Sequence, residues 1–315
     1  MASVRRAVID IGTNSIKLLV ADVDRREVQP VLEQSRQTRL GSGFYETHRL
    51  QPAAIQATAK AVSDFVEIAR RHSARSVKLI ATSAAREAKN VGDLTAAVKA
   101  VSGISVQIIS GEQEADWVFK GVTTDPVLGK LPLLILDVGG GSSEFILGHE
   151  HHKHFSASFP LGTVRLLERS PHTEPPTSAE LQTCRASISE FLEQQVRPVL
   201  DPPLRDQAQR LSKSVQLAGT GGTASILARI ELNIDSYDRA RIEGTAIHAE
   251  RVHWHAEHLW SIPLEQRRKI VGLPPDRADV ILTGVLIYEA IMVEFGFAEL
   301  RVSTRGLRFA AVLEP

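Results

Sequence analysis

Several features of secreted, membrane and nucleic-acid-binding proteins are scarce in this sequence. Its 315 residues include one cysteine, Cys184, which excludes an intramolecular disulfide framework and a cysteine cage for a metal. No apolar run approaches the roughly 20 residues of a membrane helix. The segment 1–12 has too few apolar residues for a signal peptide. We therefore expect a cytoplasmic protein without a membrane partner.

An excess of charge of either sign is also absent. The chain has 37 basic and 37 acidic side chains, so its formal net charge is zero. Proteins that coat nucleic acids usually carry a basic excess, and we expect no nucleic-acid partner here. Hydrophobic residues make up 43% and charged residues 23%, which is the ordinary range of globular proteins.

What the sequence does contain is a repeated strand–turn–strand pattern. Branched apolar residues flank Asp-Ile-Gly-Thr-Asn-Ser at 10–15, and the pattern returns as Asp-Val-Gly-Gly-Gly-Ser at 137–142, an offset of 127 residues. A repeat at domain spacing indicates an internal duplication. Alternation of strands and helices follows each copy, including helices predicted over 178–198 and 274–295. The prediction is an α/β fold with two similar domains, 1–123 plus 304–315 and 124–303.

Glycine-rich turns of this kind suit an anion, because backbone N–H groups can approach it where no Cβ intervenes. An aspartate beside such a turn favours a phosphate held together with a divalent cation. Two ordinary hairpins are the alternative interpretation. The candidate phosphate-binding residues of the two turns are Gly12, Thr13, Asn14, Ser15, Gly139, Gly140, Gly141 and Ser142. A third glycine turn follows an apolar strand and opens a helix, and it comprises Gly219, Thr220, Gly221 and Gly222.

Together these motifs resemble those of the exopolyphosphatase/guanosine pentaphosphate phosphohydrolase (Ppx/GppA) family, within the sugar kinase, heat-shock chaperone and actin superfamily. The matching stretches are 8–15, 81–90, 109–115, 136–144, 160–165, 218–223, 273–280 and 303–308. The resemblance is to the short two-domain form. It implies two duplicated actin-like (ribonuclease H-like) domains flanking an interdomain cleft, as in the actin-like ATPase fold.

The resemblance also implies roles for four carboxylates. Glu114 matches the family's catalytic base, which would activate water for attack on a terminal phosphate. Asp137 and Glu144 match residues implicated in catalysis and metal binding, and Asp10 is expected to be the partner carboxylate. The implied cofactor is Mg²⁺ or another divalent cation. One departure is Gln113, where the family commonly has a second glutamate.

Arginines are the natural side chains to grip phosphate, and Arg86 is the first candidate. Further candidates are Lys89, Arg165, Arg305 and Arg308. The family pattern continues Leu-Arg-Glu-Gly near the C-terminus, whereas this chain has Phe309 and Ala310 after Arg308, which leaves the local role of that helix open.

Other reactive side chains are interpreted as structural. Eight of the 11 histidines fall into two groups, and neither group has the spacing of a zinc protease site. We expect no functional metal site at His149, His151, His152, His154, His248, His253, His255 or His258. Cys184 lies in a predicted amphipathic helix, where plain packing is expected.

The functional prediction is a Mg²⁺-dependent exopolyphosphatase that releases phosphate from the end of inorganic polyphosphate. The same chemistry would convert guanosine pentaphosphate (pppGpp) to ppGpp, and that activity as the main one is an alternative. A superfamily kinase or ATPase and a non-catalytic alarmone-binding regulator are two more. The sequence leaves polyphosphate chain-length preference, the physiological metal and a homodimeric state open.

Overall fold

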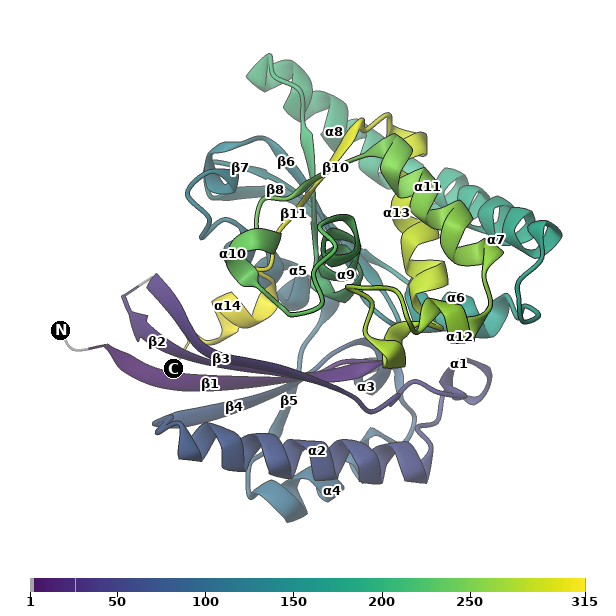
Figure 1. Cartoon of the computed structure of the whole chain (residues 1–315). Coiled ribbons are helices and arrows are strands. Elements are labelled where there is room, and N and C mark those ends of the chain that lie inside the picture. The colour runs from purple at the N-terminus through teal and green to yellow at the C-terminus, as the bar shows by residue number, and fades with distance from the viewer. Residues whose placement is uncertain (1–2, 26, 315) are drawn as a thin grey trace. The chain divides into compact units, whose positions relative to one another are not determined.

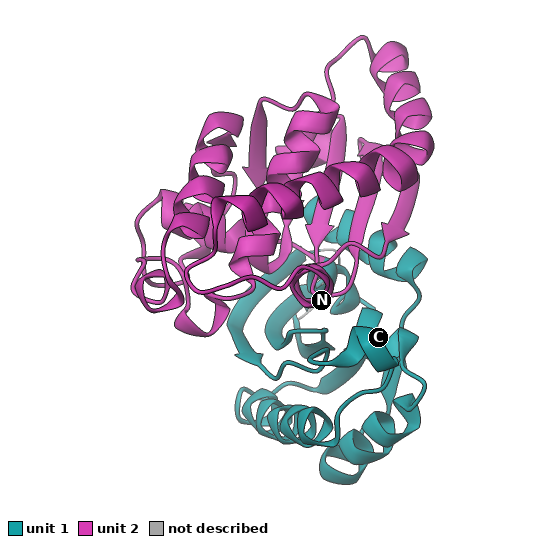
Figure 2. Cartoon of the chain, turned by 90° about the vertical axis from the view of Figure 1, so that its right-hand side faces the viewer, with its two compact units in different colours: residues 1–124, 307–315 teal, residues 125–306 magenta. Residues whose placement is uncertain are grey.

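Two compact units make up the structure, a computed structural model that describes residues 3–25 and 27–314. Unit 1 comprises residues 1–124 and 307–315, and unit 2 comprises residues 125–306 (Figure 2). The chain passes from unit 1 to unit 2 after Thr124 and returns after Gly306. The boundaries expected from the sequence lie at 123 and 303.

Unit 1 contains a five-stranded sheet in the order β3-β2-β1-β4-β5 (Figure 1). Its strands are β1 (Val4–Ile11), β2 (Ser15–Asp24), β3 (Glu27–Gln37), β4 (Ser76–Ala81) and β5 (Val106–Ile108). The first three form an antiparallel meander, whereas β4 and β5 run parallel to β1. The last five residues of β1 are all buried, which is typical of a strand covered on both faces.

Helices cover that sheet because each has a continuous apolar side. They are α1 (Phe44–Thr47), α2 (Pro52–Arg71), α3 (Ser83–Glu87), α4 (Val91–Ser102), α5 (Gly111–Val122) and α14 (Leu307–Ala311). In α2 a proline at the first position suits the helix start, and Ile55, Ala59, Val62 and Val66 form the buried stripe. Figure 1 shows α2 and α4 together on one face of the sheet and α14 on the other.

Unit 2 contains a six-stranded sheet in the order β10-β11-β9-β6-β7-β8. Its strands are β6 (Leu133–Val138), β7 (Ser143–His149), β8 (His152–Phe159), β9 (Gln216–Thr220), β10 (Ala246–His248) and β11 (Glu299–Val302). Again β6, β7 and β8 form an antiparallel meander, and β9 and β11 continue the sheet parallel to β6.

The helices of unit 2 pack around one almost fully buried helix, α13 (Ile281–Phe295). The others are α6 (Thr163–Arg169), α7 (Ser178–Phe191), α8 (Arg197–Leu211), α9 (Gly221–Glu231), α10 (Arg239–Ile242), α11 (Ala249–Ser261) and α12 (Leu264–Arg267). Single turns occur at Leu128–Lys130, Leu192–Val196 and Pro275–Arg277. Because α6, α7, α9 and α11 all contact α13, this helix is the centre of the unit's core.

The predicted duplication is confirmed by the topology of the sheets. The order β3-β2-β1-β4-β5 in unit 1 corresponds strand by strand to β8-β7-β6-β9-β11 in unit 2, where β10 is an addition. The turns match as well: the Gly12 N–H donates to the Ser15 carbonyl at 3.0 Å, and the Gly139 N–H donates to the Ser142 carbonyl at 2.9 Å. The α/β prediction with two related domains is therefore correct.

Two local predictions need correction. The helix expected over 178–198 continues to Leu211 through a π turn, although Pro202 and Pro203 lie inside α8. The helix expected over 274–295 begins at Ile281, because prolines 274 and 275 lead instead into a 3₁₀ turn. None of the helices within residues 3–25 and 27–314 is long and apolar enough to cross a membrane.

Candidate active site

The predicted site residues fall into two groups, one in each unit. In unit 2 the central feature is a pair of carboxylates, because Asp137 and Glu144 are direct cross-strand partners in the β6–β7 ladder. Directly opposed residues of antiparallel strands project from the same face of a sheet. Glu144 is only 1% exposed, and its Oε1 accepts hydrogen bonds from the Ser142 hydroxyl at 2.9 Å and the Ser158 hydroxyl at 2.8 Å.

The third glycine turn lies against this carboxylate pair. Strand β9 runs parallel to β6, with Thr220 beside Asp137, so that Gly221 begins α9 next to the aspartate. Gly221 has a φ of +89°, and a Cβ there would lie 2.3 Å from Asp137 Oδ1. Only glycine combines this backbone conformation with this approach. The structure thus brings the turn 219–222 to the second hairpin, which the sequence motif alone indicated only weakly.

The segment that follows β8 forms hydrogen bonds with the turn of the second hairpin. The Gly140 carbonyl accepts the backbone N–H groups of Val164 and Arg165, and Arg165 Nε donates to the Gly141 carbonyl at 2.7 Å. A Cβ at Gly162 would meet the Gly140–Gly141 backbone at about 2.5 Å, so this approach also requires glycine. Arg165, a candidate phosphate ligand, therefore supports the turn. Among the residues that the structure describes, the Gly140 and Gly141 N–H groups donate no hydrogen bond.

Tyr288 is a member of this group that sequence reasoning missed. Its hydroxyl lies 3.2 Å from the carbonyls of Leu136 and Thr220, at the ends of β6 and β9. Burial, together with the charge of Asp137, raises the pKa of Tyr288 well above its usual value, so the phenol is neutral at ordinary pH. The available signal was one tyrosine within the mainly apolar segment 281–293, which also contains Thr283 and Glu289. Tyr288 fixes the spacing of the two strand ends that carry Asp137 and the glycine turn.

In unit 1 the candidate base is joined to the candidate arginine. Glu114 lies in the first turn of α5 and is 6% exposed, whereas Glu112 is exposed, as their angular separation on a helix predicts. Arg86, from α3, donates to Glu114 Oε2 and to the Ile109 carbonyl, both at 3.0 Å. The helix start is fixed by the Ser110 hydroxyl, which accepts the Gln113 N–H. Glu114 is thus a buried carboxylate with a defined orientation.

Asp10 ends β1 in the same unit and is 5% exposed. Burial raises the pKa of Asp10, although the positive charges of Lys17 and Arg308 act in the opposite direction. Within the described residues its Oδ1 is buried without a hydrogen-bond partner. The cross-strand partner of Asp10 is Lys17, at the place that Glu144 occupies opposite Asp137. The two hairpins therefore have the same backbone conformation, but the side chain opposite the aspartate is basic in the first and acidic in the second.

The other residues of the first turn are all buried: Thr13, Asn14 and Ser15. The Asn14 carbonyl accepts the N–H groups of Thr38 and Arg39, and the Asn14 side-chain oxygen accepts a hydrogen bond from Gln37. The loop after β3 therefore supports this turn, as the segment after β8 supports the second one.

These donors fit a hard divalent cation. Mg²⁺ usually keeps several waters and takes one or two carboxylates plus substrate phosphates, rather than a closed protein cage. Asp137 and Glu144 supply two carboxylates on one sheet face in unit 2. In unit 1, the buried Asp10 Oδ1 is a separate acceptor. Residues 3–25 and 27–314 contain no group of three or more His, Cys, Asp or Glu suited to a metal.

Two of the three remaining candidate cations, Arg308 and Arg305, have side-chain partners. Arg308 donates to the Leu18 carbonyl at 3.0 Å and to Glu33 at 3.3 Å, and Arg305 lies 4.0 Å from Glu243. For Lys89 the structure describes a backbone hydrogen bond to His48. These contacts give Arg308 and Arg305 a role in holding the C-terminal part of the chain.

Three of the histidines that were interpreted as structural have side-chain partners. The His253 and His255 rings each lie 2.6 Å from a glutamate, Glu289 and Glu231. His258 stacks on Trp254. Cys184 is buried in the core, and burial raises the pKa of its thiol to about 11.

Comparison with known proteins identifies the family of this chain. The model of the Ppx/GppA phosphatase family matches residues 19–314. Exopolyphosphatase 2 of Mycobacterium tuberculosis is 36% identical over 98% of this chain and 97% of its own length. A guanosine-5'-triphosphate,3'-diphosphate pyrophosphatase of Vibrio cholerae is 28% identical over 98% of this chain and 58% of its own length. The Ppx/GppA crystal structure from Aquifex aeolicus superposes with a TM-score of 0.75 at 29% identity, covering 99% of this chain and 97% of that one. This chain belongs to the Ppx/GppA phosphatase family.

Proposed function

We propose that this protein is an exopolyphosphatase, which hydrolyses the terminal phosphoanhydride bond of inorganic polyphosphate and releases phosphate. The observation that carries the proposal is the buried Glu114 carboxylate, which Arg86 holds in one orientation at the start of α5. A relative with 36% identity along nearly its whole length is named for the same activity.

In the proposed reaction Glu114 accepts a proton from a water molecule. The water oxygen attacks the terminal phosphorus, and the bridging P–O bond breaks in line with the attack. The electron pair of that bond stays with the shortened polyphosphate. Arg86 positions Glu114 for this step, because its guanidinium is itself anchored on the Ile109 carbonyl.

The glycine turns are proposed to bind the phosphate oxygens. Hydrogen-bond donors without protein partners are the natural ligands of an anion, and the N–H groups of Gly140 and Gly141 have this character within the described residues. The start of α9 at Gly221 adds helix N–H groups next to the same turn. We assign the turn 12–15 to the same role by its correspondence with 139–142.

In unit 2, Asp137 and Glu144 are the residues that would hold Mg²⁺, largely through water, and Asp10 is the candidate metal ligand of unit 1. A bound divalent cation would neutralise phosphate charge and so allow carboxylates to stand beside a polyanion. We place the protein in the cytoplasm, where polyphosphate and pppGpp are its candidate partners.

Guanosine pentaphosphate is the second candidate substrate, because its terminal phosphoanhydride is the same reacting group and a pppGpp-hydrolysing relative is 28% identical. The test is the rate of phosphate release from long-chain polyphosphate and from pppGpp, each with Mg²⁺ and with a chelator. We expect Mg²⁺-dependent release with the higher kcat/KM on polyphosphate. A higher value on pppGpp would reverse the assignment, and turnover only of ATP with an acceptor would favour a kinase. If neither substrate is hydrolysed but pppGpp binds, the protein is a regulator.

A further inference from the structure

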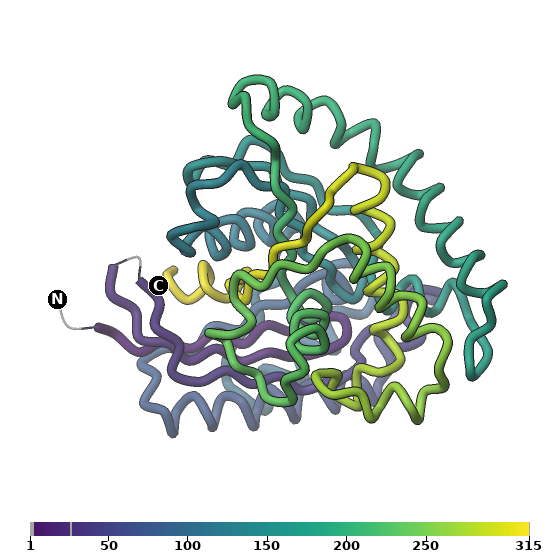
Figure 3. The backbone as a smooth tube through the Cα atoms, turned by 45° about the horizontal axis from the view of Figure 1, so that its top comes forward, coloured from purple at the N-terminus to yellow at the C-terminus, as the bar shows by residue number. Residues whose placement is uncertain are grey.

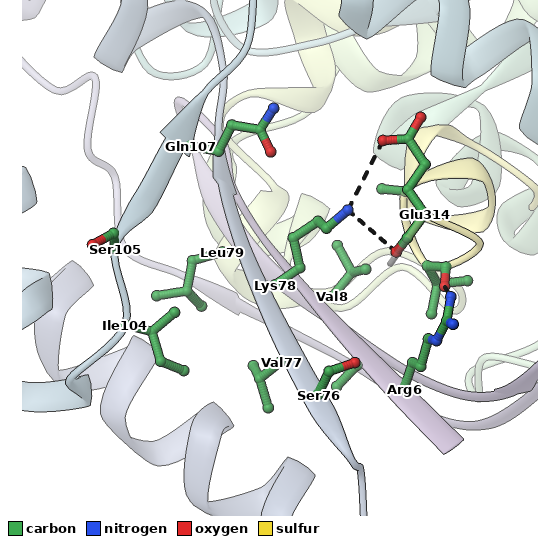
Figure 4. A pocket seen from close by; sticks show the side chains of 13 residues that line it. Arg6, Val8, Ser76, Val77, Lys78, Leu79, Ile104, Ser105, Gln107 and Glu314 are labelled. Carbon is green, nitrogen blue, oxygen red and sulfur yellow. Dashed lines mark hydrogen bonds and ion pairs between the residues drawn. The ribbon is translucent and has the colours of Figure 1, made fainter. Parts of the chain in front are cut away.

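After α14 (Leu307–Ala311), the segment 312–314 is bound to the strands of unit 1. Arg6 Nη1 donates to the Leu313 carbonyl at 2.8 Å and to the Val312 carbonyl at 3.4 Å. Lys78 Nζ donates to the Glu314 carbonyl at 3.3 Å. Figure 4 shows Lys78 reaching toward Glu314 beside a cavity of about 250 Å³. Figure 3 shows the C-terminal turns (yellow) beside the first strands (purple).

The Glu314 side chain makes a contact of a different kind. Its Oε1 accepts a hydrogen bond from the indole N–H of Trp117 at 2.7 Å, across 197 residues of sequence. Trp117 is 1% exposed, and a buried indole N–H requires an acceptor. Lys78 Nζ lies 3.9 Å from Glu314 Oε2 and 5.9 Å from the centre of the indole ring. The carboxylate is therefore held between a buried donor and a cation.

Trp117 places this contact on the helix that carries the candidate base. It follows Glu114 by three residues in α5, so the two side chains lie on adjacent positions of one helix face. The same helix packs against α14, from which the segment 312–314 extends. Because a helix turn is rigid, a restraint on Trp117 also restrains Glu114.

We infer that Glu314 is a positioning residue for the hydrolysis: through Trp117 it fixes α5 and so sets the orientation of Glu114. This inference rests on the proposed function. Arg86 restrains the Glu114 carboxylate directly, whereas Glu314 restrains the helix backbone from which that carboxylate projects.

Two substitutions of Glu314 distinguish the effect of its hydrogen bond to Trp117 from the effect of its negative charge. Glu314→Gln keeps an oxygen acceptor for the indole, and Glu314→Met removes it at similar length. We expect Glu314→Met to lower kcat roughly 3- to 10-fold with KM within about twofold of the unaltered chain, since small misplacements of a catalytic group are costly. Glu314→Gln should retain kcat within about twofold. Glu112→Gln is the matched control, because Glu112 is an exposed acid on the same helix.

The indole N–H signals in a ¹⁵N–¹H correlation spectrum report the contact without any substrate. The chain has three tryptophans, Trp117, Trp254 and Trp260, and Trp117→Phe assigns the relevant signal. We expect Glu314→Met to move the Trp117 signal upfield and speed its hydrogen exchange. The signals of Trp254 and Trp260 should stay in place, which shows that the variant is folded.

An unmoved Trp117 signal in Glu314→Met would overturn the inference, and so would a moved signal with unchanged kcat. If the unaltered chain hydrolyses neither polyphosphate nor pppGpp, the proposed function fails and the kinetic role of Glu314 fails with it. A moved Trp117 signal would then still establish the restraint on α5, so the two failures are distinguishable.

Discussion

Arg86 Nη1 donates a 3.0 Å hydrogen bond to Glu114 Oε2, and the same nitrogen donates to the Ile109 carbonyl at 3.0 Å. The arginine thus joins the carboxylate to the end of β5. This relationship adds to the expected role of Arg86, because the contact indicates that it orients the candidate base, while its role as a phosphate ligand stays a prediction.

We predict that Arg86→Met lowers both kcat and stability. Removal of the guanidinium leaves a buried carboxylate without its cation, which costs about 1–3 kcal/mol of unfolding free energy. Urea unfolding and steady-state kinetics measure the two effects. Arg36→Met is the control, because Arg36 pairs with Asp64 in an exposed ion pair, and such pairs contribute little. Equal stability of the two variants would contradict the prediction.

Gly221 and Gly244 offer a test of the glycine turn. Both have positive φ angles, +89° and +75°, but a Cβ at Gly221 would meet Asp137, whereas nothing lies within 4 Å at Gly244. Alanine at either position carries the backbone cost of roughly 1–2 kcal/mol. Only Gly221→Ala should also displace Asp137, and we predict at least a tenfold loss of kcat/KM for this variant alone. Similar kinetics for the two variants would argue against a role for this contact.

We predict that the native Asp10 carboxylate lowers the free energy of unfolding when no metal is bound. Its pKa is raised in the folded protein, so folding is penalised wherever the unfolded carboxyl is ionised, above about pH 3.8. Asp10→Asn should therefore raise the unfolding free energy at pH 7 by about 1–3 kcal/mol, and this gain should vanish as pH falls below the unfolded value.

Asp22→Asn is the control for Asp10→Asn, and its expected effect on the free energy of unfolding is the opposite one. The Arg5 guanidinium holds the pKa of Asp22 below its usual value, so Asp22→Asn should lower stability at pH 7. That loss should fade in acid. Mg²⁺ should raise the melting temperature of the unaltered chain more than that of Asp10→Asn, since ligands stabilise the state that binds them. A lower free energy of unfolding for Asp10→Asn at pH 7 would contradict this prediction. It would show that interactions in the folded protein outweigh the cost of burying the Asp10 carboxylate.

Much of the fold was predictable because its signals are local. The repeat of Asp-x-Gly turns at 127 residues gave the duplication, and period-two and helical patterns located most strands and helices. Helix ends near prolines were less predictable, as the start of α13 at Ile281 illustrates. There the chain adopts a 3₁₀ turn that local propensity does not distinguish from a first helical turn.

For the candidate site, the sequence predicted individual residues but not how they come together in space. Asp137, Glu144 and the turns carry recognisable motifs, but their assembly depends on the parallel pairing of β6 with β9, which joins residues about 80 positions apart. Tyr288 and Glu314 carry no motif at all. Their roles follow from long-range contacts with Thr220 and Trp117, and a single sequence contains no signal for such pairs.

The central claim is that Glu114 activates water for phosphoanhydride hydrolysis. Phosphate released from long-chain polyphosphate in the presence of Mg²⁺, by the unaltered chain and by Glu114→Gln, tests it most directly. We predict steady release by the unaltered chain and a loss of about 100-fold or more in kcat for Glu114→Gln, since general-base catalysis contributes that much. The free energy of unfolding in urea should be unchanged to within about 1 kcal/mol. Equal kcat values for the two proteins would contradict the account.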